Sequence, residues 1–219
     1  MSITNFYQYG PDRKDVKHLV IMLHGVGSNG QDLISLAPIF SMGLEDVAFL
    51  SPDAPFVCDM VPPGYPNAFQ WFSLQDRDPH VMLSGVQDSL PLVEQFIEQR
   101  LEEYDVPASK LVLLGFSQGT MTSLHVAPRL KEEVAGVLGY SGALLWDVKA
   151  NADDLQKMPI HLIHGEADDV VPVDARMQAQ DTLEKSGFSV SGHTTPGLAH
   201  SIDQAGIESG LAFLQKVLK

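Results

Sequence analysis

The fold is decided by one run of sequence, Leu111-Val112-Leu113-Leu114-Gly115-Phe116-Ser117-Gln118-Gly119. The first four residues are apolar, which predicts a strand buried on both faces of a sheet. Two glycines then flank Ser117, and a helical pattern with buried candidates Met121 and Leu124 follows. A strand, a tight turn and a helix in this order are typical of α/β proteins.

Ser117 in this turn is a candidate nucleophile. A Gly-x-Ser-x-Gly turn between a strand and a helix strains the serine backbone and lifts its hydroxyl to the carboxyl end of the sheet. Side chains at positions 115 and 119 would collide with neighbouring backbone. The five-residue pattern alone is weak, and a plain turn with an inert serine is the alternative interpretation.

The rest of the chain alternates between short apolar runs and helical stripes, which predicts a mainly parallel sheet. Further strands are expected at Leu19–Leu23, Val47–Leu50, Val134–Leu138 and Ile160–Ile163, with Phe188–Thr194 nearer the sheet edge. One helix is expected from the stripe Val86, Leu90, Val93, Ile97, Leu101 and Tyr104, with a kink or restart at Pro91. A second helix is expected at Asp174–Lys185 and is stopped by Gly187. A third helix is expected at the end of the chain, where the apolar stripe consists of Ile207, Leu211, Leu214 and Leu218.

Residues 53–79 fit neither the helical nor the strand period of apolar residues, and they are rich in proline and aromatic side chains. A long loop in a compact domain is often functional, so we interpret this segment as a substrate-side wall or lid. A surface loop packed by its own aromatic rings is the alternative.

Composition narrows the class of protein. The 219 residues fit one domain over 1–219, and 44% are apolar, which indicates a sizeable core. The formal net charge of −14 disfavours nucleic acid and anionic lipid as partners. We expect a cytoplasmic protein without stable membrane anchoring. Cys58 is the only cysteine, no signal peptide is visible, and no apolar run reaches membrane-spanning length.

A serine nucleophile needs a base, and the base needs a group that orients it. Enzymes with such an elbow carry the acid and then the histidine downstream of the serine. Asp168 follows the strand Ile160–Ile163 and is the preferred acid, with Asp169 as its rival and Glu166 less suitable. His200 is the preferred base because it lies in a loop between the last strand and the last helix.

The oxyanion hole needs two backbone donors. We expect the amide of Gln118 to be one and the amide of Val26, in the glycine-rich loop after the first strong strand, to be the other. That loop lacks the lysine of a phosphate loop and the Gly-x-Gly-x-x-Gly order of dinucleotide sites. A metal site among the acidic residues near Asp168 and a Cys58 nucleophile are weak alternatives, since no metal spacing and no base for the thiol are visible.

Together these motifs resemble the carboxylesterase, lysophospholipase and acyl-protein thioesterase family. The likeness runs from about Leu19 to the final helix and includes Leu23-His24-Gly25-Val26-Gly27, the elbow, His164-Gly165-x-x-Asp168-x-x-Val171-Pro172 and Gly197-x-x-His200. It implies a single α/β-hydrolase domain without a large cap, a triad of Ser117, Asp168 and His200, and no metal or cofactor. It also implies Val26 and Gln118 as oxyanion donors. The substrate side is expected to include Trp71, Leu144 and Met60.

Three residues depart from the family pattern and leave substrate preference open. Thr120 replaces a second glycine after the elbow, Asp169 stands where proline is common, and Ser28 stands where aspartate is common. We expect a carboxylesterase for short- to medium-chain esters. The alternatives are an acyl-protein thioesterase, a lysophospholipase, or a binding protein on a hydrolase scaffold. Partners would be a small ester or thioester, with a homodimer left open.

Overall fold

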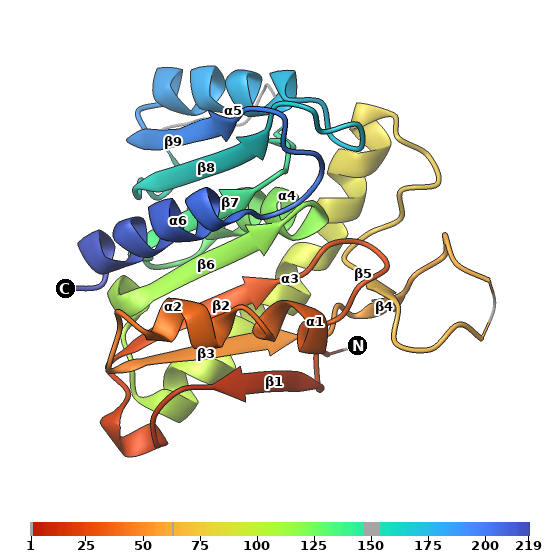
Figure 1. Ribbon diagram of the computed structural model, residues 1–219. Helices are drawn as coiled ribbons and strands as arrows, with labels where there is room; N and C mark the ends of the chain where they lie inside the picture. The colour runs from red at the N-terminus through yellow and green to blue at the C-terminus, as the bar shows by residue number, and fades with distance from the viewer. Residues whose placement is uncertain (1, 63, 147–153) are drawn as a thin grey trace.

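The computed structural model describes residues 2–62, 64–146 and 154–219 and forms one unit around a seven-stranded sheet (Figure 1). The strand order is β1-β3-β2-β6-β7-β8-β9. Only the edge strand β1 runs antiparallel to its neighbour within this sheet. The strands are β1 Phe6–Tyr9, β2 His18–Leu23, β3 Val47–Pro52, β6 Leu111–Phe116, β7 Gly136–Tyr140, β8 Ile160–Gly165 and β9 Val190–Thr195.

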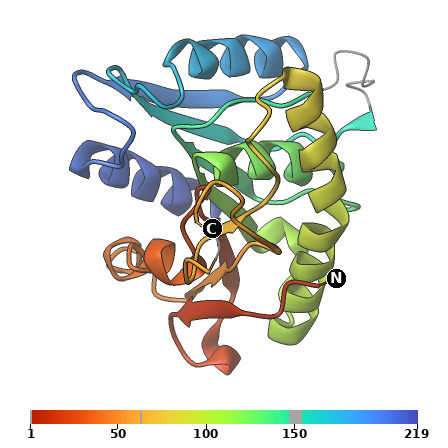
Figure 2. The ribbon, with the colours of Figure 1, turned by 90° about the vertical axis from the view of Figure 1, so that its right-hand side faces the viewer.

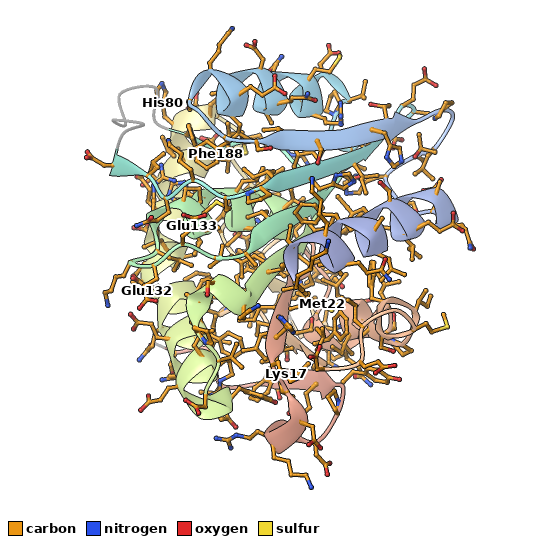
Figure 3. The ribbon with its side chains drawn as sticks, turned by 90° about the vertical axis from the view of Figure 1, so that its left-hand side faces the viewer. Lys17, Met22, His80, Glu132, Glu133 and Phe188 are labelled. Atoms are coloured by element: carbon orange, nitrogen blue, oxygen red, sulfur yellow. The ribbon has the colours of Figure 1, made fainter. Side chains whose placement is uncertain are left out.

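Helices cover both faces of the sheet because successive strand residues point to opposite faces and both sets are apolar. Leu19, Ile21 and Leu23 pack with α3, α4 and α5, whereas Val20 and Met22 pack with α1, α2 and α6. Figure 3 shows α3 on one side of the sheet and α2 and α6 on the other. The helices are α1 Gly30–Ile34, α2 Ala37–Ser41, α3 Pro79–Tyr104, α4 Gln118–Val126, α5 Asp174–Lys185 and α6 Gln204–Val217, with short 3-10 turns at Arg13–Asp15, Ala108–Lys110 and Ala127–Arg129.

The predicted α/β architecture is confirmed, with four corrections to individual elements. The strand predicted from Val134 begins at Gly136, β1 was missed, and so were the short helices α1 and α2. Of the kink or restart expected at Pro91, the restart does not occur, because α3 is one helix of 26 residues that includes this proline. Val86 and Val93 on either side of the proline are fully buried, and their packing stabilises the helix that the proline ring weakens.

The segment 53–79 crosses the carboxyl end of the sheet, as the orange and yellow chain in Figure 2 shows. It is not wholly irregular, since β4 Phe56–Val57 and β5 Phe69–Gln70 form a short antiparallel hairpin. Trp71 and Phe72 beside β5 are buried in the main core. Residue 63 of this segment lies outside the described residues.

Within the described ranges, no helix is both long enough and apolar enough to cross a membrane. The longest helix, α3, alternates buried residues such as Phe96 and Ile97 with exposed polar ones. Its length therefore serves to cover one face of the sheet.

Two histidines are buried away from the elbow turn and stay uncharged. His125 on α4 bonds through Nδ1 to the Leu145 carbonyl at 3.0 Å. His161 on β8 lies between the hydroxyls of Ser191 and Ser209, each 2.8 Å from a ring nitrogen. Burial lowers the pKa of both imidazoles to about 4. These histidines are structural, as their places in a helix and a strand indicate.

We expect the free energy of unfolding to fall as the pH drops from about 6.5 towards 4. In that range the unfolded chain takes up protons that the folded chain does not bind at these two histidines, so acid favours unfolding. Each histidine should cost about 2 kcal/mol at about pH 5. Urea unfolding at neutral pH and at about pH 5 measures how much the free energy of unfolding falls between these two conditions. The variant His125→Gln should make this decrease smaller by about 2 kcal/mol. An unchanged pH dependence in this variant would refute the argument for His125.

Candidate active site

Ser117 occupies a strained turn between β6 and α4. Its backbone has φ 54° and ψ −118°, an unusual conformation for a residue other than glycine. The Ser117 amide donates to the Tyr140 carbonyl at 2.9 Å, which fixes the turn to the end of β7. The predicted strain at the serine is therefore present.

The turn is possible because α4 approaches β2 with no side chain between them. A Cβ atom added to Gly119 would lie 1.8 Å from the Leu23 carbonyl oxygen. No rotation of a side chain relieves such a contact, because the neighbouring atom belongs to the backbone. Glycine is therefore required at position 119, as the sequence predicted.

Asp168 and His200, which are 32 positions apart in sequence, meet at the carboxyl end of the sheet. His200 Nδ1 lies 2.7 Å from Asp168 Oδ2, and the Asp168 side chain is fully buried. The Val170 and Val171 amides donate to the other carboxylate oxygen at 2.9 and 2.8 Å. Asp169, the rival acid, is exposed and makes none of these contacts.

The Asp168 carboxylate is held in its ionised form. Burial by itself would raise its pKa, but the hydrogen bonds from His200, Val171 and Val170 outweigh burial and lower the pKa. A carboxylate that stays charged can orient the imidazole and stabilise the cation that forms when the ring takes up a proton.

The His200 ring is brought to the elbow by Phe116, the residue before Ser117. The two ring centroids are 4.9 Å apart, so the histidine loop packs directly on the end of β6. The side chain of His200 is 16% exposed, which leaves it reachable from solvent. Ser117, Asp168 and His200 thus come from three separate segments and lie at one end of the sheet.

A second imidazole, His164, contacts the same carboxylate and was not predicted. Its Nε2 atom donates to the Val171 carbonyl at 2.7 Å and lies 3.3 Å from Asp168 Oδ2. Burial lowers the pKa of His164, so the ring is neutral and adds no charge next to Asp168. A single sequence carries no signal for this contact beyond the spacing of four residues between His164 and Asp168.

The glycine-rich loop after β2 lies against the serine. A Cβ added to Gly25 would be 3.4 Å from the Ser117 Cβ, so the loop backbone borders the elbow. Within this loop the Gly27 amide donates to the Phe69 carbonyl, and the Ser28 amide donates to the Gly25 carbonyl. Among the described residues, the Val26 amide donates no hydrogen bond to a backbone acceptor outside the helices and strands. The Gln118 amide begins α4, where no preceding helical turn supplies an acceptor.

The side chain of Gln118 ties the segment 53–79 to the elbow. Its Oε1 accepts from the Trp71 amide at 2.9 Å, and its Nε2 donates to the Phe72 carbonyl at 2.7 Å. The Trp71 indole donates to the carbonyl of His24 at 2.9 Å. One buried network therefore joins the elbow helix, the glycine-rich loop and the segment 53–79.

The three predicted substrate contacts differ in accessibility. Trp71 is fully buried and serves the network just described, Leu144 is half-buried, and Met60 is 49% exposed. A direct contact between substrate and Trp71 would require the residues that cover this side chain to move. All three stay predictions as substrate-binding residues.

Thr120, which departs from the family pattern, joins α4 to β7. Its hydroxyl donates to the Tyr140 carbonyl at 2.8 Å and accepts from the Tyr140 amide at 3.0 Å. The same carbonyl accepts from the Ser117 amide. A Cβ added to Gly142 would lie 2.4 Å from Thr120 Cβ, so the threonine fills space that Gly142 leaves open.

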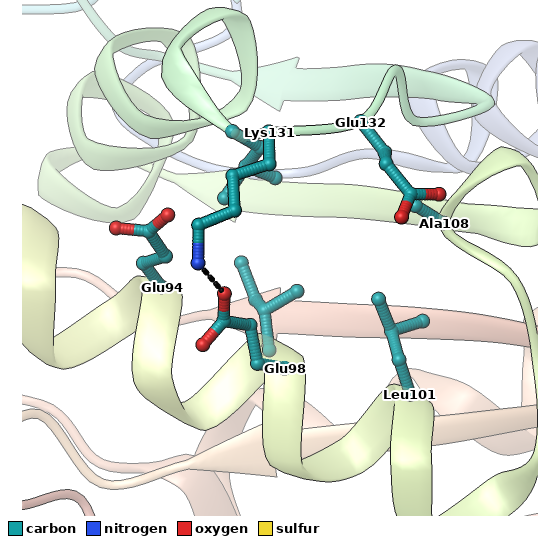
Figure 4. Close-up of a pocket in the computed structure, with 8 residues that line it drawn as sticks. Glu94, Glu98, Leu101, Ala108, Lys131 and Glu132 are labelled. Atoms are coloured by element: carbon teal, nitrogen blue, oxygen red, sulfur yellow. Dashed lines mark hydrogen bonds and ion pairs between the residues drawn. The ribbon is translucent and has the colours of Figure 1, made fainter.

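A separate hollow lies between α3 and the segment after α4, and it includes none of the predicted site residues (Figure 4). Glu98 of α3 and Lys131 form an ion pair across it at 2.6 Å. This pair is exposed, so its contribution to stability is small.

The chain is similar to known ester and thioester hydrolases over nearly its whole length. Residues 10–218 match the family described as Phospholipase/Carboxylesterase. Acyl-protein thioesterase 1 of Debaryomyces hansenii is 28% identical over 94% of each chain. Esterase YpfH of Escherichia coli is 27% identical, covering 98% of this chain and 89% of that protein. The crystal structure of esterase PE8 has a TM-score of 0.89 and 32% identity, covering 97% of this chain and 98% of that one.

We expect Thr120→Val to lower the free energy of unfolding by about 1–3 kcal/mol, because it leaves the buried Tyr140 amide without its acceptor. The variant should also slow labelling of Ser117 by a fluorophosphonate. Thr120→Ser keeps the hydroxyl and should restore the labelling rate. Thr122→Val is the matched control, since the Thr122 hydroxyl bonds only to the Gln118 carbonyl of its own helix. Equal effects of the two valine variants would argue against a specific role for Thr120.

Proposed function

The chain belongs to the phospholipase/carboxylesterase family and is a serine-dependent ester hydrolase, and we propose that it hydrolyses short- to medium-chain carboxylic esters through an acyl-enzyme on Ser117. The observation that carries this proposal is the 2.7 Å bond between His200 and a buried Asp168 beside the strained Ser117 turn. This arrangement supports a base that is oriented by an acid and lies next to a raised nucleophile.

The proposed reaction has two halves. In the first, Ser117 Oγ attacks the ester carbonyl carbon while His200 Nε2 takes the hydroxyl proton, and Asp168 holds the Nδ1 proton. The amides of Val26 and Gln118 stabilise the negative charge on the former carbonyl oxygen. His200 then gives its proton to the departing alcohol. In the second half, water attacks the acyl-enzyme by the same route and releases the acid.

Hydrolysis of acyl-protein thioesters is a second candidate for the same site, favoured by the relatives named acyl-protein thioesterase 1. The chemistry is the same, since a thiol replaces the alcohol as leaving group. A panel of p-nitrophenyl esters and acyl thioesters of graded chain length separates the two candidates by their kcat/KM values.

We also propose a cytoplasmic location without stable membrane anchoring. Cys58 is buried and is the only cysteine, so the fold has no internal disulfide to lose in a reducing compartment. The net charge of −14 opposes lasting contact with anionic lipid. A homodimer stays a prediction, which light scattering would test.

We expect Ser117→Ala to reduce kcat for p-nitrophenyl butyrate by at least about 10³-fold and to abolish the fluorophosphonate adduct, because the nucleophile is removed. Ser123→Ala is the matched control. Ser123 is buried on the same helix, and its hydroxyl donates only to the Gly119 carbonyl. Mass spectrometry locates the adduct. Hydrolysis by Ser117→Ala at the wild-type rate would exclude this serine as the nucleophile.

We expect Asp168→Asn to lower kcat by about 10³-fold or more, and Asp169→Asn to change it little, because only Asp168 contacts His200. The lowered pKa of Asp168 keeps its carboxylate ionised in mild acid. The Asp168→Asn defect should therefore be present throughout the range from neutral pH to mild acid. A large defect in Asp169→Asn, or wild-type activity in Asp168→Asn, would be inconsistent with these roles.

A further inference from the structure

A cavity of about 300 Å³ lies beside His200, between the glycine-rich loop with α1 and the segment that leads into α6. Both segments lie at the carboxyl end of the sheet, on the right of Figure 1. The cavity is lined at one side by Ser28, Asp32 and Leu36, and at the other by Phe116, His200 and Ile202. The segment 53–79 contributes no residue to this lining.

The position of this cavity fits the leaving group better than the acyl group. The general acid must lie next to the oxygen or sulfur that departs, while the carbonyl oxygen faces the oxyanion amides. The alcohol or thiol therefore lies on the His200 side of the bond that breaks. We propose, on the basis of the function proposed above, that this cavity holds the leaving group and that Asp32 makes it favour cationic alcohols or thiols.

The charge of the cavity comes from one residue. Among the described residues that line it, Asp32 is the only Asp, Glu, Lys or Arg. Burial lowers the pKa of His24, so this neighbouring imidazole is neutral and does not offset the carboxylate. The cavity therefore carries the negative charge of Asp32, and its described lining includes no lysine or arginine that would attract an anionic leaving group.

Asp32 is held in place while its charge remains available. The Ser28 hydroxyl and the Asn29 side-chain amide donate to Oδ2 of Asp32 at 2.9 and 3.1 Å. Both contacts use the same oxygen, and the residue is exposed at the cavity. Leu36 and Ile202 offer apolar contact for the alkyl groups of a substituted ammonium.

The expected preference is modest because the carboxylate faces water. A cation about 5 Å from one exposed carboxylate gains about threefold to tenfold in apparent affinity at low ionic strength, and salt reduces this gain.

The test compares butyrylcholine with 3,3-dimethylbutyl butyrate, two esters of the same acid whose alcohols have the same shape and differ in charge. A pH-stat measures kcat/KM for each ester. Because a charged alcohol also changes intrinsic reactivity, the readout is the ratio of the two kcat/KM values in each variant. Asp32→Asn should lower this ratio by about threefold to tenfold and leave the neutral ester nearly unaffected. Added salt should lower the ratio in the wild type but not in Asp32→Asn.

Asp88→Asn is the matched control. Asp88 is an exposed aspartate on α3, which packs on the other face of the sheet from α1, and its loss changes the net charge equally. The proposal is supported if the ratio of the two kcat/KM values is unchanged in Asp88→Asn and lower in Asp32→Asn. The same ratio in Asp32→Asn and wild type, or equal decreases in both variants, would overturn it. If the wild type hydrolysed neither ester and Ser117 took no fluorophosphonate, the proposed function would fail as well.

Discussion

The contact between the backbones of α4 and β2 is the constraint on which the site depends. The first turn of α4 must come so close to Leu23 that position 119 can carry no side chain. This closeness brings the Gln118 amide and the glycine-rich loop after β2 to the same place. It also holds Ser117 in a strained backbone conformation that this residue would not keep in an unfolded chain. The cost of that strain is offset by the buried strands on both sides, whose packing fixes the ends of the turn.

Hydrogen bonds between distant segments then complete the geometry. The Tyr140 carbonyl accepts from both Ser117 and Thr120, which joins the elbow to β7. The Gln118 side chain joins it to the segment 53–79. The neutral imidazole of His164 contacts the charged Asp168 without adding charge of its own. Asp168 thus stays a buried carboxylate held by oriented dipoles, which favours a developing positive charge on His200.

The parts that follow local patterns could be predicted from sequence, and the parts that depend on tertiary contacts could not. The central strands, α3 and α6 follow from apolar periodicity, and the strained turn at Ser117 follows from its glycines. The short helices α1 and α2 carry too few turns for a periodic signal. The strand β1 pairs only at the sheet edge. The role of Thr120 depends on the space beside Gly142, and that of Trp71 depends on the Gln118 side chain, so neither is visible along the chain.

The tie between Gln118 and the segment 53–79 also limits how this protein can diversify. The Trp71 backbone and indole are bound to the elbow and to the glycine-rich loop, so a change at this residue disturbs both parts of the site together. The stretch between Cys58 and Ala68 is joined to the glycine-rich loop by the bond from the Asn29 side-chain amide to the Asn67 carbonyl. Its described residues share no hydrogen bond with Gln118 or Trp71, which bond to each other and to the His24 carbonyl instead. A change of sequence in this stretch is therefore less directly coupled to Ser117 than a change at Trp71.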